Sequence, residues 1–555
     1  MLIKLTGGRV YDPIHHINGE VRDLYLRDGR IVADPGQAAV DQEYDLRGKV
    51  VMAGGIDLHT HIGGGKVNIG RNMLPEDHRR HPMAHTPLTR SGCGHAAPST
   101  FVTGYRYAQM GYTACFEPAM VPINARHTHL ELADTPMVDK GTYALLGSDD
   151  FLLRMLAQGA DQKAINDYVA WTLHATRSIA VKVVNPGGIS AFKFNQRKLD
   201  LDEPNAYYGV TPRAILQRLT RAVTDLGVPH PVHLHGCNLG VPGNADTTLD
   251  TIAAAEGLPL HLTHVQFHSY GAEGDFKFSS AAARIAEAVN HNRNVTVDVG
   301  QVMFGQTVTA SGDTMAQYRN HRHASPRKWM CMDIECEAGC GVVPFRYRDQ
   351  NFVNALQWLI GLELFLLIQD PWRVLLTVDH PNGAAFTTYP HLIRLLMDRS
   401  YRNDLLATIN KSAAAMSTLG SIDREYSLYE IAILTRAGPA RILGLTDRGH
   451  LGPGAVADIT VYTEHDNKEE MFARPAYVFK GGELVAKDGV IQKVVWGATH
   501  VVRPNYDPAI EKPLREYFER YHTMRLEHFK LGDEELLDDG RGRIQVHPCA
   551  VGWRA

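Results

Sequence analysis

The sequence is poor in cysteine and nearly free of net charge, and each shortage excludes a class of protein. Only 7 of the 555 residues are cysteine, too few for the disulfide framework of a small secreted domain and in keeping with a reducing cytoplasm. The 57 Lys and Arg residues almost balance the 61 Asp and Glu residues, which leaves a formal charge of −4. Because phosphate binding needs a basic surplus or stripe, we expect no nucleic-acid partner.

Long apolar runs are missing as well. The most apolar stretch, residues 352–372, has Glu363 at its centre and ends in Asp370-Pro371, whereas a membrane-spanning helix needs about 20 apolar residues almost free of charge. We interpret this stretch as a buried helix that leads into a strand. The first eight residues lack the basic and apolar regions of a secretory signal, so we expect a cytoplasmic protein with no membrane partner.

The middle of the chain alternates short apolar stretches with helical ones. Eight of these stretches have the length and composition of buried strands. They are residues 56–62, 113–119, 143–148, 179–184, 231–235, 260–265, 295–302 and 374–378. Eight strands, most of them followed by a helix, predict an α/β fold of the TIM type, a (β/α)₈ barrel.

Both ends of the chain differ from the middle. Residues 8–31 and 457–485 alternate apolar and polar side chains around glycine turns, which predicts strands and hairpins in one small sheet domain assembled from both termini. The domains we expect are residues 1–52 with 440–500 for this sheet, 53–439 for the barrel, and 501–555 for a charged C-terminal helical extension.

Side chains that can bind metals or take part in catalysis lie at the ends of the predicted barrel strands. His59 and His61 alternate on the first strand, so both face the barrel interior, at the end where barrel active sites lie. Lys182 interrupts an otherwise apolar fourth strand. A buried lysine either pairs with an acid or loses its charge, and a neutral amine can capture carbon dioxide as a carbamate.

The fifth, sixth and eighth strands supply further candidates. They are His233 and His235, His264, and Asp379. Each could be a satisfied core residue, but five strand ends that bring such side chains to one barrel mouth favour a metal centre. Nitrogen and oxygen donors suit zinc, nickel, iron or manganese, with zinc the usual metal for hydrolysis.

The order His-X-His, Lys, His, His, Asp on strands one, four, five, six and eight resembles the amidohydrolase superfamily, whose members add a composite β-sandwich to the barrel. Residues 451–459 resemble its C-terminal turn, although Ala53-Gly54-Gly55 stands where Pro-Gly is more usual. Longer blocks resemble the A-subunit family of formylmethanofuran dehydrogenase, most of all the bacterial members. These blocks are residues 66–71, 75–78, 183–188, 264–271, 341–345, 379–383, 386–387 and 389–390.

The resemblance implies a dinuclear centre of two divalent metal ions, with Zn²⁺ the first choice. Its ligands would be His59, His61, His235 and His264, with a carbamylated Lys182 as the bridge and Asp379 as the catalytic carboxylate and a further ligand. His233 is the alternative to His235, which we prefer because it lies nearer the end of its strand.

The same resemblance places substrate-binding residues on the loop after strand one. Lys66, Asn68 and Arg71 would hold the formyl oxygen or an anionic product. The plainer alternative is a solvated basic loop, because substrate-binding residues and solvent-exposed charged residues both concentrate in loops.

The implied reaction is hydrolysis of the N-formyl group of formyl-methanofuran, or of a methylofuran-type carrier, to formate and the free amine. Bacterial members act in the formyltransferase/hydrolase complex of formaldehyde oxidation, with the B, C and D subunits as partners. Archaeal members would condense formate with methanofuran instead. Two alternatives stay open: a generic cyclic-amide or N-acyl amidohydrolase, and a metal-free scaffold within the complex.

Overall fold

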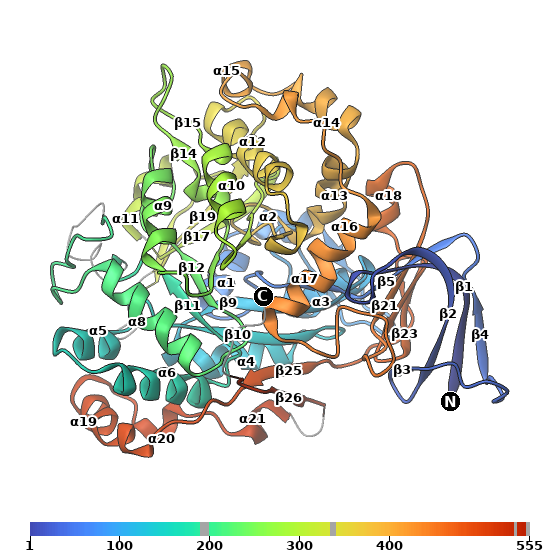
Figure 1. The fold of residues 1–555 in the computed structure, drawn as a ribbon, viewed down its shortest axis with the longest axis horizontal. Coiled ribbons are helices and arrows are strands. Elements are labelled where there is room, and N and C mark those ends of the chain that lie inside the picture. Colours follow the sequence, from blue (N-terminus) through green and yellow to red (C-terminus); the bar gives the residue numbers. More distant parts are fainter. Residues whose placement is uncertain (189–198, 313, 333–339, 538–540, 551–555) are drawn as a thin grey trace.

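The computed structural model describes residues 1–188, 199–312, 314–332, 340–537 and 541–550 of the chain. Two large sheets organise it (Figure 1). A ten-stranded sheet forms the centre, and a nine-stranded sheet lies beside it at the N-terminal end. Among the described residues, no helix has the length and apolar character needed to cross a membrane.

Eight parallel strands of the central sheet form the barrel, and each pairs with the next along the chain. They are β6 (Gly55–Asp57), β9 (Tyr112–Met120), β10 (Asp139–Leu145), β11 (Ala180–Val184), β12 (Val232–His235), β13 (Leu260–Leu262), β16 (Val295–Asp298) and β20 (Val374–Leu375). A parallel bridge between Thr60 and His380 joins the ends of the first and last strands. The predicted (β/α)₈ barrel is therefore confirmed.

Helices cover the outside of the barrel, which explains why its strands are apolar along their whole length. Among them are α3 (Thr100–Gln109), α6 (Gln162–Thr176), α8 (Pro212–Asp225), α10 (Ala282–His291) and α12 (Phe352–Leu367). Helix α12 is the most apolar stretch of the sequence and leads towards β20, as predicted. Its Glu363 is buried and accepts hydrogen bonds from Ser280, Ser417 and Thr418.

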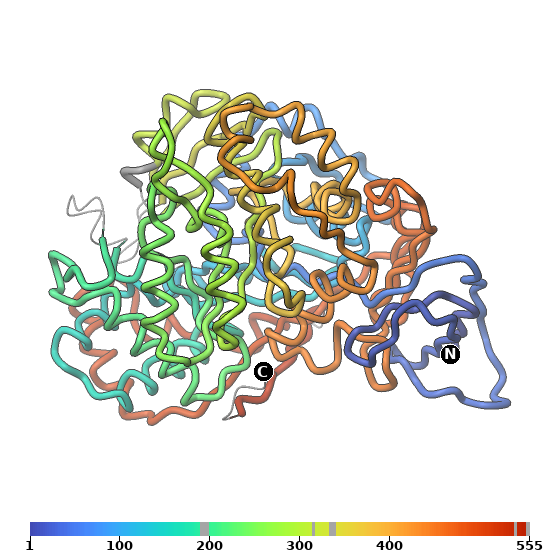
Figure 2. The backbone as a smooth tube through the Cα atoms, turned by 45° about the horizontal axis from the view of Figure 1, so that its top comes forward, coloured from blue at the N-terminus to red at the C-terminus, as the bar shows by residue number. Residues whose placement is uncertain are grey.

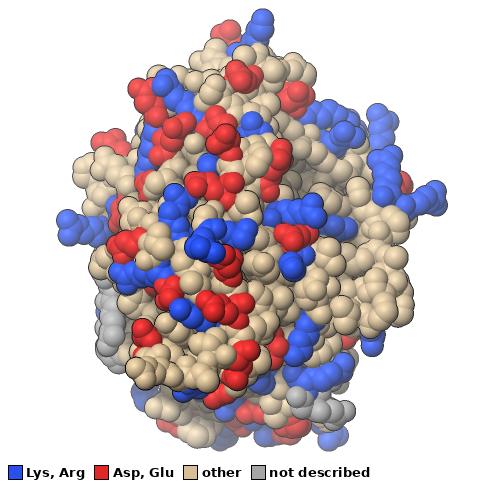
Figure 3. All heavy atoms as spheres, turned by 90° about the vertical axis from the view of Figure 1, so that its right-hand side faces the viewer, with Lys and Arg blue, Asp and Glu red and all other residues tan. Residues whose placement is uncertain are grey.

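Strands from both termini form the nine-stranded sheet, as the sequence predicts. They are β1 (Leu2–Asp12), β2 (Ile17–Arg27), β3 (Arg30–Val32), β4 (Gln42–Asp45), β5 (Lys49–Ala53), β21 (Ile459–Thr463), β22 (Tyr477–Lys480), β23 (Glu483–Lys487) and β24 (Val490–Ile491). The two termini meet where β5 pairs with β21. On the face that carries this sheet, basic and acidic side chains are interspersed (Figure 3), in keeping with the small net charge.

The C-terminal extension is only partly helical. Helix α19 (Glu511–Tyr521) runs along α5 (Asp150–Ala157) and α6 in both backbone views (Figures 1 and 2). The chain then returns as strand β26 (Arg543–His547), which pairs in parallel with β25 (Ala498–Val502) and so joins the central sheet. The predicted helical extension is therefore incomplete, because the segment also contains strand β26. The predicted domain boundaries stay a prediction.

A small three-stranded sheet lies in the long excursion before the last barrel strand. It consists of β17 (Gly305–Ser311), β18 (Met330–Met332) and β19 (Cys340–Tyr347). Strands β17 and β19 pack against α1 (Gly65–Asn72), the helix that follows the first barrel strand. This sheet therefore stands over the carboxyl ends of the barrel strands.

Candidate metal centre and active site

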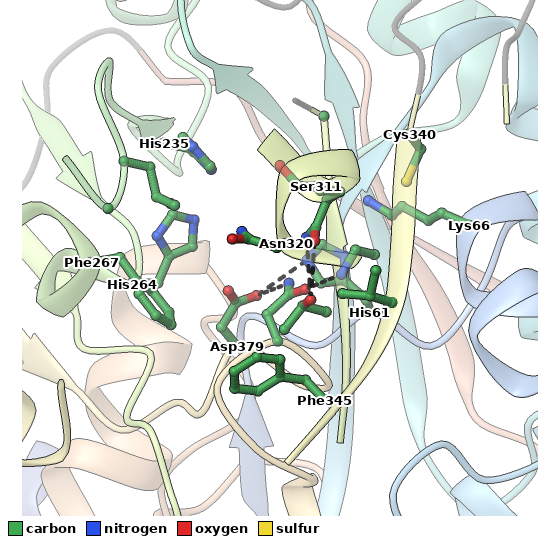
Figure 4. A pocket seen from close by; sticks show the side chains of 18 of the residues that line it. His61, Lys66, His235, His264, Phe267, Ser311, Asn320, Cys340, Phe345 and Asp379 are labelled. Carbon is green, nitrogen blue, oxygen red and sulfur yellow. Dashed lines mark hydrogen bonds and ion pairs between the residues drawn. The ribbon is translucent and has the colours of Figure 1, made fainter. Parts of the chain in front are cut away.

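A cavity of about 1000 Å³ opens at the carboxyl ends of the barrel strands. Its wall includes His235, the last residue of β12, and Lys182 of β11, together with residues of β17 and β19. In Figure 4, His235 and His264 stand together on one side, His61 stands on the other, and Asp379 lies between them. The cavity thus lies where this fold assembles catalytic groups.

His59 and His61 both direct a ring nitrogen at Asp379. The Nε2 atoms of His59 and His61 lie 2.9 and 3.2 Å from Oδ1 of Asp379. On its other side, Nδ1 of His61 lies 2.9 Å from Oε1 of the buried Glu117. Burial would raise the pKa of Glu117, but His61, Lys66 and the backbone N–H of Gly63 together outweigh burial, and the pKa falls to about 2. The ionised Glu117 therefore accepts a hydrogen bond from Nδ1–H and orients the ring of His61.

Two further histidines fix the tautomer of His59. Nδ1 of His230 lies 3.3 Å from the carbonyl oxygen of Ile442, and it must donate because that oxygen has no proton. Burial lowers the pKa of His230, His233 and His59, so each ring carries one proton. His230 Nε2 then accepts from His233 Nδ1 (2.9 Å), and His233 Nε2 accepts from His59 Nδ1 (2.8 Å), which also lies 2.5 Å from Thr263 Oγ1. His59 Nε2 is left without a proton.

That lone pair faces a carboxylate. His59 Nε2 and Asp379 Oδ1 are 2.9 Å apart, and in this tautomer both atoms are acceptors. Two buried acceptors at this distance repel each other unless a cation lies against both. Ligand atoms of His59, His264 and Asp379 all lie within 4.8 Å of one another, so a metal ion meets that requirement.

Lys182 lies inside the barrel on β11 and is 1% exposed. Its Nζ has no hydrogen-bond partner in the described part of the chain. Burial is the largest influence and lowers the pKa of Lys182 to about 7, despite the opposing charges of Asp298 and Asp379. The geometry therefore favours the neutral amine over the salt bridge that the sequence left open.

His235 and His264 form the opposite side of the site. Their ring centroids are 4.6 Å apart, and Nε2 of His235 and Nδ1 of His264 are buried without a hydrogen-bond partner among the described residues. His264 has a positive φ of 36°, and its backbone nitrogen donates to Asp298 Oδ1 at 2.9 Å. His235 lies on the cavity wall, whereas His233 is fully buried behind His59 with both nitrogens bonded.

The segment after the first barrel strand is a helix, α1, and not the predicted loop. Lys66 lies on the cavity wall, where Nζ donates to Ala119 O at 3.1 Å. Asn68 and Arg71 share a different face of the helix, because residues three apart lie on the same side. Both bond to Glu131 there, and neither lies on the wall of the large cavity. The geometry therefore supports a substrate contact for Lys66 and not for the other two.

The mouth of the cavity is basic. Five exposed arginines contribute to the wall, all from the excursion before the last barrel strand. They are Arg319, Arg322, Arg327, Arg346 and Arg348. A cleft lined by one sign of charge raises the local concentration of ligands of the opposite sign, so this mouth favours anionic groups.

Several of these site residues were not predicted from the sequence. Glu117 and Asp298 are single acids in apolar predicted strands, the same signal that identified Lys182, so that signal could have found them. The arginines lie in an irregular segment, where no periodicity predicts which side chains face a cavity. The pairing of His230 with His233 depends on the ring orientations, which spacing does not determine.

The residues of the site fit a divalent metal centre. Buried nitrogens of Lys182, His235 and His264 have no partner in the described part of the chain, and such groups are rare because they lose their hydration without compensation. The donor set is imidazole and carboxylate, which suits zinc and similar ions. Together with a neutral lysine, the set can support metal-assisted hydrolysis.

Comparisons with known proteins agree with this geometry. The family model described as "Amidohydrolase family" matches residues 42–491. The chain is 44% identical to the A subunit of the formyltransferase/hydrolase complex Fhc of Methylorubrum extorquens over 544 residues, 96% of this chain and 97% of the relative. It is 43% identical to "Protein FwdA" of Methanocaldococcus jannaschii over 553 residues, which covers 96% of each chain.

A solved structure matches almost the whole chain. It is a chain of the crystal structure of the formyltransferase/hydrolase complex (FhcABCD) from Methylorubrum extorquens in complex with methylofuran. The TM-score is 0.93 at 42% identity, and the match covers 99% of this chain and all of the other.

Proposed function

The chain belongs to the amidohydrolase family, and from that premise we propose that it is the hydrolase component of a formyltransferase/hydrolase complex. Its reaction is hydrolysis of the N-formyl group on a methylofuran-type carrier, with formate and the free carrier amine as products. The observation that carries this proposal is the 44% identity to the A subunit of Fhc across 97% of that relative. The match at a TM-score of 0.93 to a chain of the methylofuran complex supports it.

The proposed metal centre holds two divalent ions, with Zn²⁺ the first choice. Its ligands are His59, His61, His235, His264, Asp379 and the carbamate of Lys182. The unpartnered Nζ of Lys182 and its pKa of about 7 support the carbamate, because only the neutral amine reacts with carbon dioxide. Metal ions in such a centre supply Lewis acidity, which polarises a carbonyl and lowers the pKa of water from 15.7 towards ~7.

Asp379 is the proposed proton carrier. As an ionised carboxylate on the cavity wall, Asp379 can accept the proton that water loses as its oxygen bonds to the formyl carbon. The bond from carbon to nitrogen then breaks, and Asp379 returns the proton to the departing nitrogen, because an amine anion is too basic to leave unprotonated. Lys66 and the basic mouth hold the formate anion.

The proposed surroundings follow from the same relatives. The B, C and D subunits of the complex are the partners, and the formyl-methanofuran-type carrier is the substrate. A cytoplasmic location is supported by the cysteines, because all six that the structure describes are free thiols. The 43% identity to FwdA keeps one second candidate, the synthetic direction with methanofuran in a dehydrogenase complex.

Metal content and formate release test the proposal together. We expect the purified complex to contain about two metal ions per copy of this chain and to release formate from an N-formyl furfurylamine carrier. Lys182→Ala should lose both properties, and a small carboxylate added to that variant should restore part of the activity by replacing the carbamate. The matched control is Lys140→Ala, a second buried lysine whose Nζ donates to Thr135 O.

Three other outcomes would redirect the proposal. Full metal and activity in Lys182→Ala would exclude the carbamate. Hydrolysis of cyclic amides alone would favour a generic amidohydrolase, and an assembled complex without metal or activity would leave a scaffold role. Formate condensation with methanofuran, without formyl transfer, would favour the synthetic candidate.

A further inference from the structure

His268 is a buried imidazole that bonds to nothing in the described part of the chain. His268 is only 4% exposed, and neither its Nδ1 nor its Nε2 has a hydrogen-bond partner among the described residues. A buried polar group without a partner destabilises a protein, because it has lost its hydration without compensation. Such a group in a native structure indicates a missing partner, such as water, an ion or a ligand.

The backbone fixes His268 beside the candidate metal centre. It ends the short 3₁₀ helix Val265–His268, which begins directly after His264. Phe267 N donates to His264 O at 3.0 Å, and Thr248 Oγ1 donates to His268 O at 2.7 Å. On the side of residues 264–268 these bonds involve only backbone atoms, so both nitrogens of the His268 imidazole remain available.

The ring of His268 lies against two proposed ligands. Its centroid is 5.3 Å from that of His235 and 5.5 Å from that of His264. One nitrogen from each of the three residues can be chosen so that all lie within 4.8 Å of one another. Histidine binds metals through a ring nitrogen, and neither ring nitrogen of His268 is used by another bond in the described part of the chain.

We propose that His268 is a third imidazole ligand of the metal ion that His235 and His264 hold. The inference rests on the proposed metal centre and adds a residue to it. It makes the two halves of the centre unequal, because three imidazoles converge on one side, while His59, His61 and Asp379 serve the other. The half with His268 should bind its ion more tightly and fill first during reconstitution.

Zinc-loaded crystals and variants test this inference directly. Anomalous diffraction from the complete complex should place a nitrogen of His268 at about 2.0–2.1 Å from one zinc ion. In His268→Ala, the ion held by His235 and His264 should dissociate into a chelator at least about tenfold faster than in the unmodified protein. Cobalt-substituted protein should change its visible absorption, because one nitrogen ligand is lost.

A matched control separates ligation from general disturbance of the fold. His129 is also buried, and its ring bonds to the carbonyl oxygen of Thr176, away from the site. His129→Gln should leave the cobalt spectrum and the chelation rate unchanged. His268→Gln keeps a polar side chain of similar length but lacks the imidazole. Its cobalt spectrum should still differ from that of the unmodified protein, which excludes a simple packing effect.

Two results would overturn the inference, and they differ in what they leave standing. If both zinc ions bind and formate is released, but His268 lies more than about 3 Å from each ion, far beyond a zinc–nitrogen bond, the third ligand is refuted and the proposed function stands. If no metal binds and no formate appears, both fail together.

Discussion

Among single residues, the proposed metal ligands are oriented by side chains that do not themselves lie on the cavity wall. His230 and His233 do not lie on the cavity wall, yet the direction of their hydrogen bonds decides which nitrogen of His59 is free. Glu117 does the same for His61. Partners of this kind hold a histidine in the tautomer that binds a metal. No binding free energy is then spent on converting the ring from the other tautomer.

Removing the partner behind His59 should therefore weaken metal binding. His233→Leu removes one of two acceptors near His59 Nδ1 and leaves Thr263 Oγ1, a hydroxyl that can also donate and so does not fix the tautomer. We expect its metal affinity to fall about 10–100-fold. His233→Gln offers a carbonyl oxygen at a similar place and should retain most of the affinity. Competition with a chelator measures both variants, and equal affinity in His233→Leu and the unmodified protein would show that the tautomer is set elsewhere.

Gly300 controls the position of His264. Its φ is 64°, and a Cβ built there would lie 2.2 Å from the Cβ of His264. Gly300→Ala should displace His264, reduce metal occupancy and lower formate release about tenfold or more, while backbone strain destabilises the fold by about 1–3 kcal/mol.

Gly159→Ala is the control for the strain alone. Gly159 also has a positive φ, of 74°, but nothing lies within 4 Å of its added Cβ. This variant should lower Tm without changing the metal content, which atomic absorption measures. Loss of metal in both variants would mean that strain, and not the contact with His264, is responsible.

At the scale of elements, strand β26 is the feature that the sequence did not predict. It pairs along its whole length with β25 and brings His547 against His500. The two rings are stacked with centroids 4.9 Å apart, and His500 Nδ1 lies 2.7 Å from His547 Nε2. A strand that joins a sheet edge is stabilised mainly by that pairing and by the side chains it buries.

Acid should release this strand before the barrel unfolds. Burial, and then the charges of His500 and Arg448, lower the pKa of His547 from 6.5 to about 4, although Asp447 acts in the opposite direction. Between these pH values the unfolded segment binds a proton that the folded one excludes, so stability is complete above pH 6.5 and decreases as the pH falls towards 4. Hydrogen exchange at pH 7 and pH 5 should show the β26 amides losing protection first.

His547→Gln removes the titrating group and tests the cause. Its β26 amides should exchange with a much smaller dependence on pH, whatever its protection at pH 7. An unchanged pH dependence in this variant would assign the effect to other histidines, such as His129, whose pKa burial lowers to about 4.

At the scale of the whole molecule, a buried group of charges joins the barrel to the sheet of the two termini. Asp139 on β10 accepts from Arg448 at 2.6 Å and from Lys480 on β22 at 2.7 Å. Lys480 also bonds to Asp458 at 2.7 Å, and Ala498 N donates to the other oxygen of Asp139. Four segments far apart in the sequence therefore meet at one carboxylate.

Breaking this group should destabilise the whole chain. Lys480→Met leaves Asp139 and Asp458 buried with one fewer cation, and losing one partner of a buried pair costs about 3–5 kcal/mol. We expect a clear fall in Tm and in the denaturant midpoint. Lys493→Met is the control, because Lys493 pairs with Glu483 at the exposed surface and should change Tm little. Equal effects of the two variants would contradict a special role for the buried group.

Local sequence features were enough to predict the order of the barrel strands and the candidate residues of the site. Strand period and apolar length located eight strands, and His59, His61, Lys182, His264 and Asp379 stood out as polar groups at strand ends. These signals are local, since a strand has the same alternation wherever it packs.

The positions and hydrogen-bond partners of those groups become visible only in the folded chain. Folding turned His235 to the cavity and put His233 behind His59, and it directed Asn68 and Arg71 towards Glu131. The physical reason is that tautomers, burial and helix faces depend on contacts between segments that lie far apart in the chain. The sequence gives the identity of each side chain and predicts its position on a helix or strand. The partner that the side chain contacts depends on how distant segments pack together.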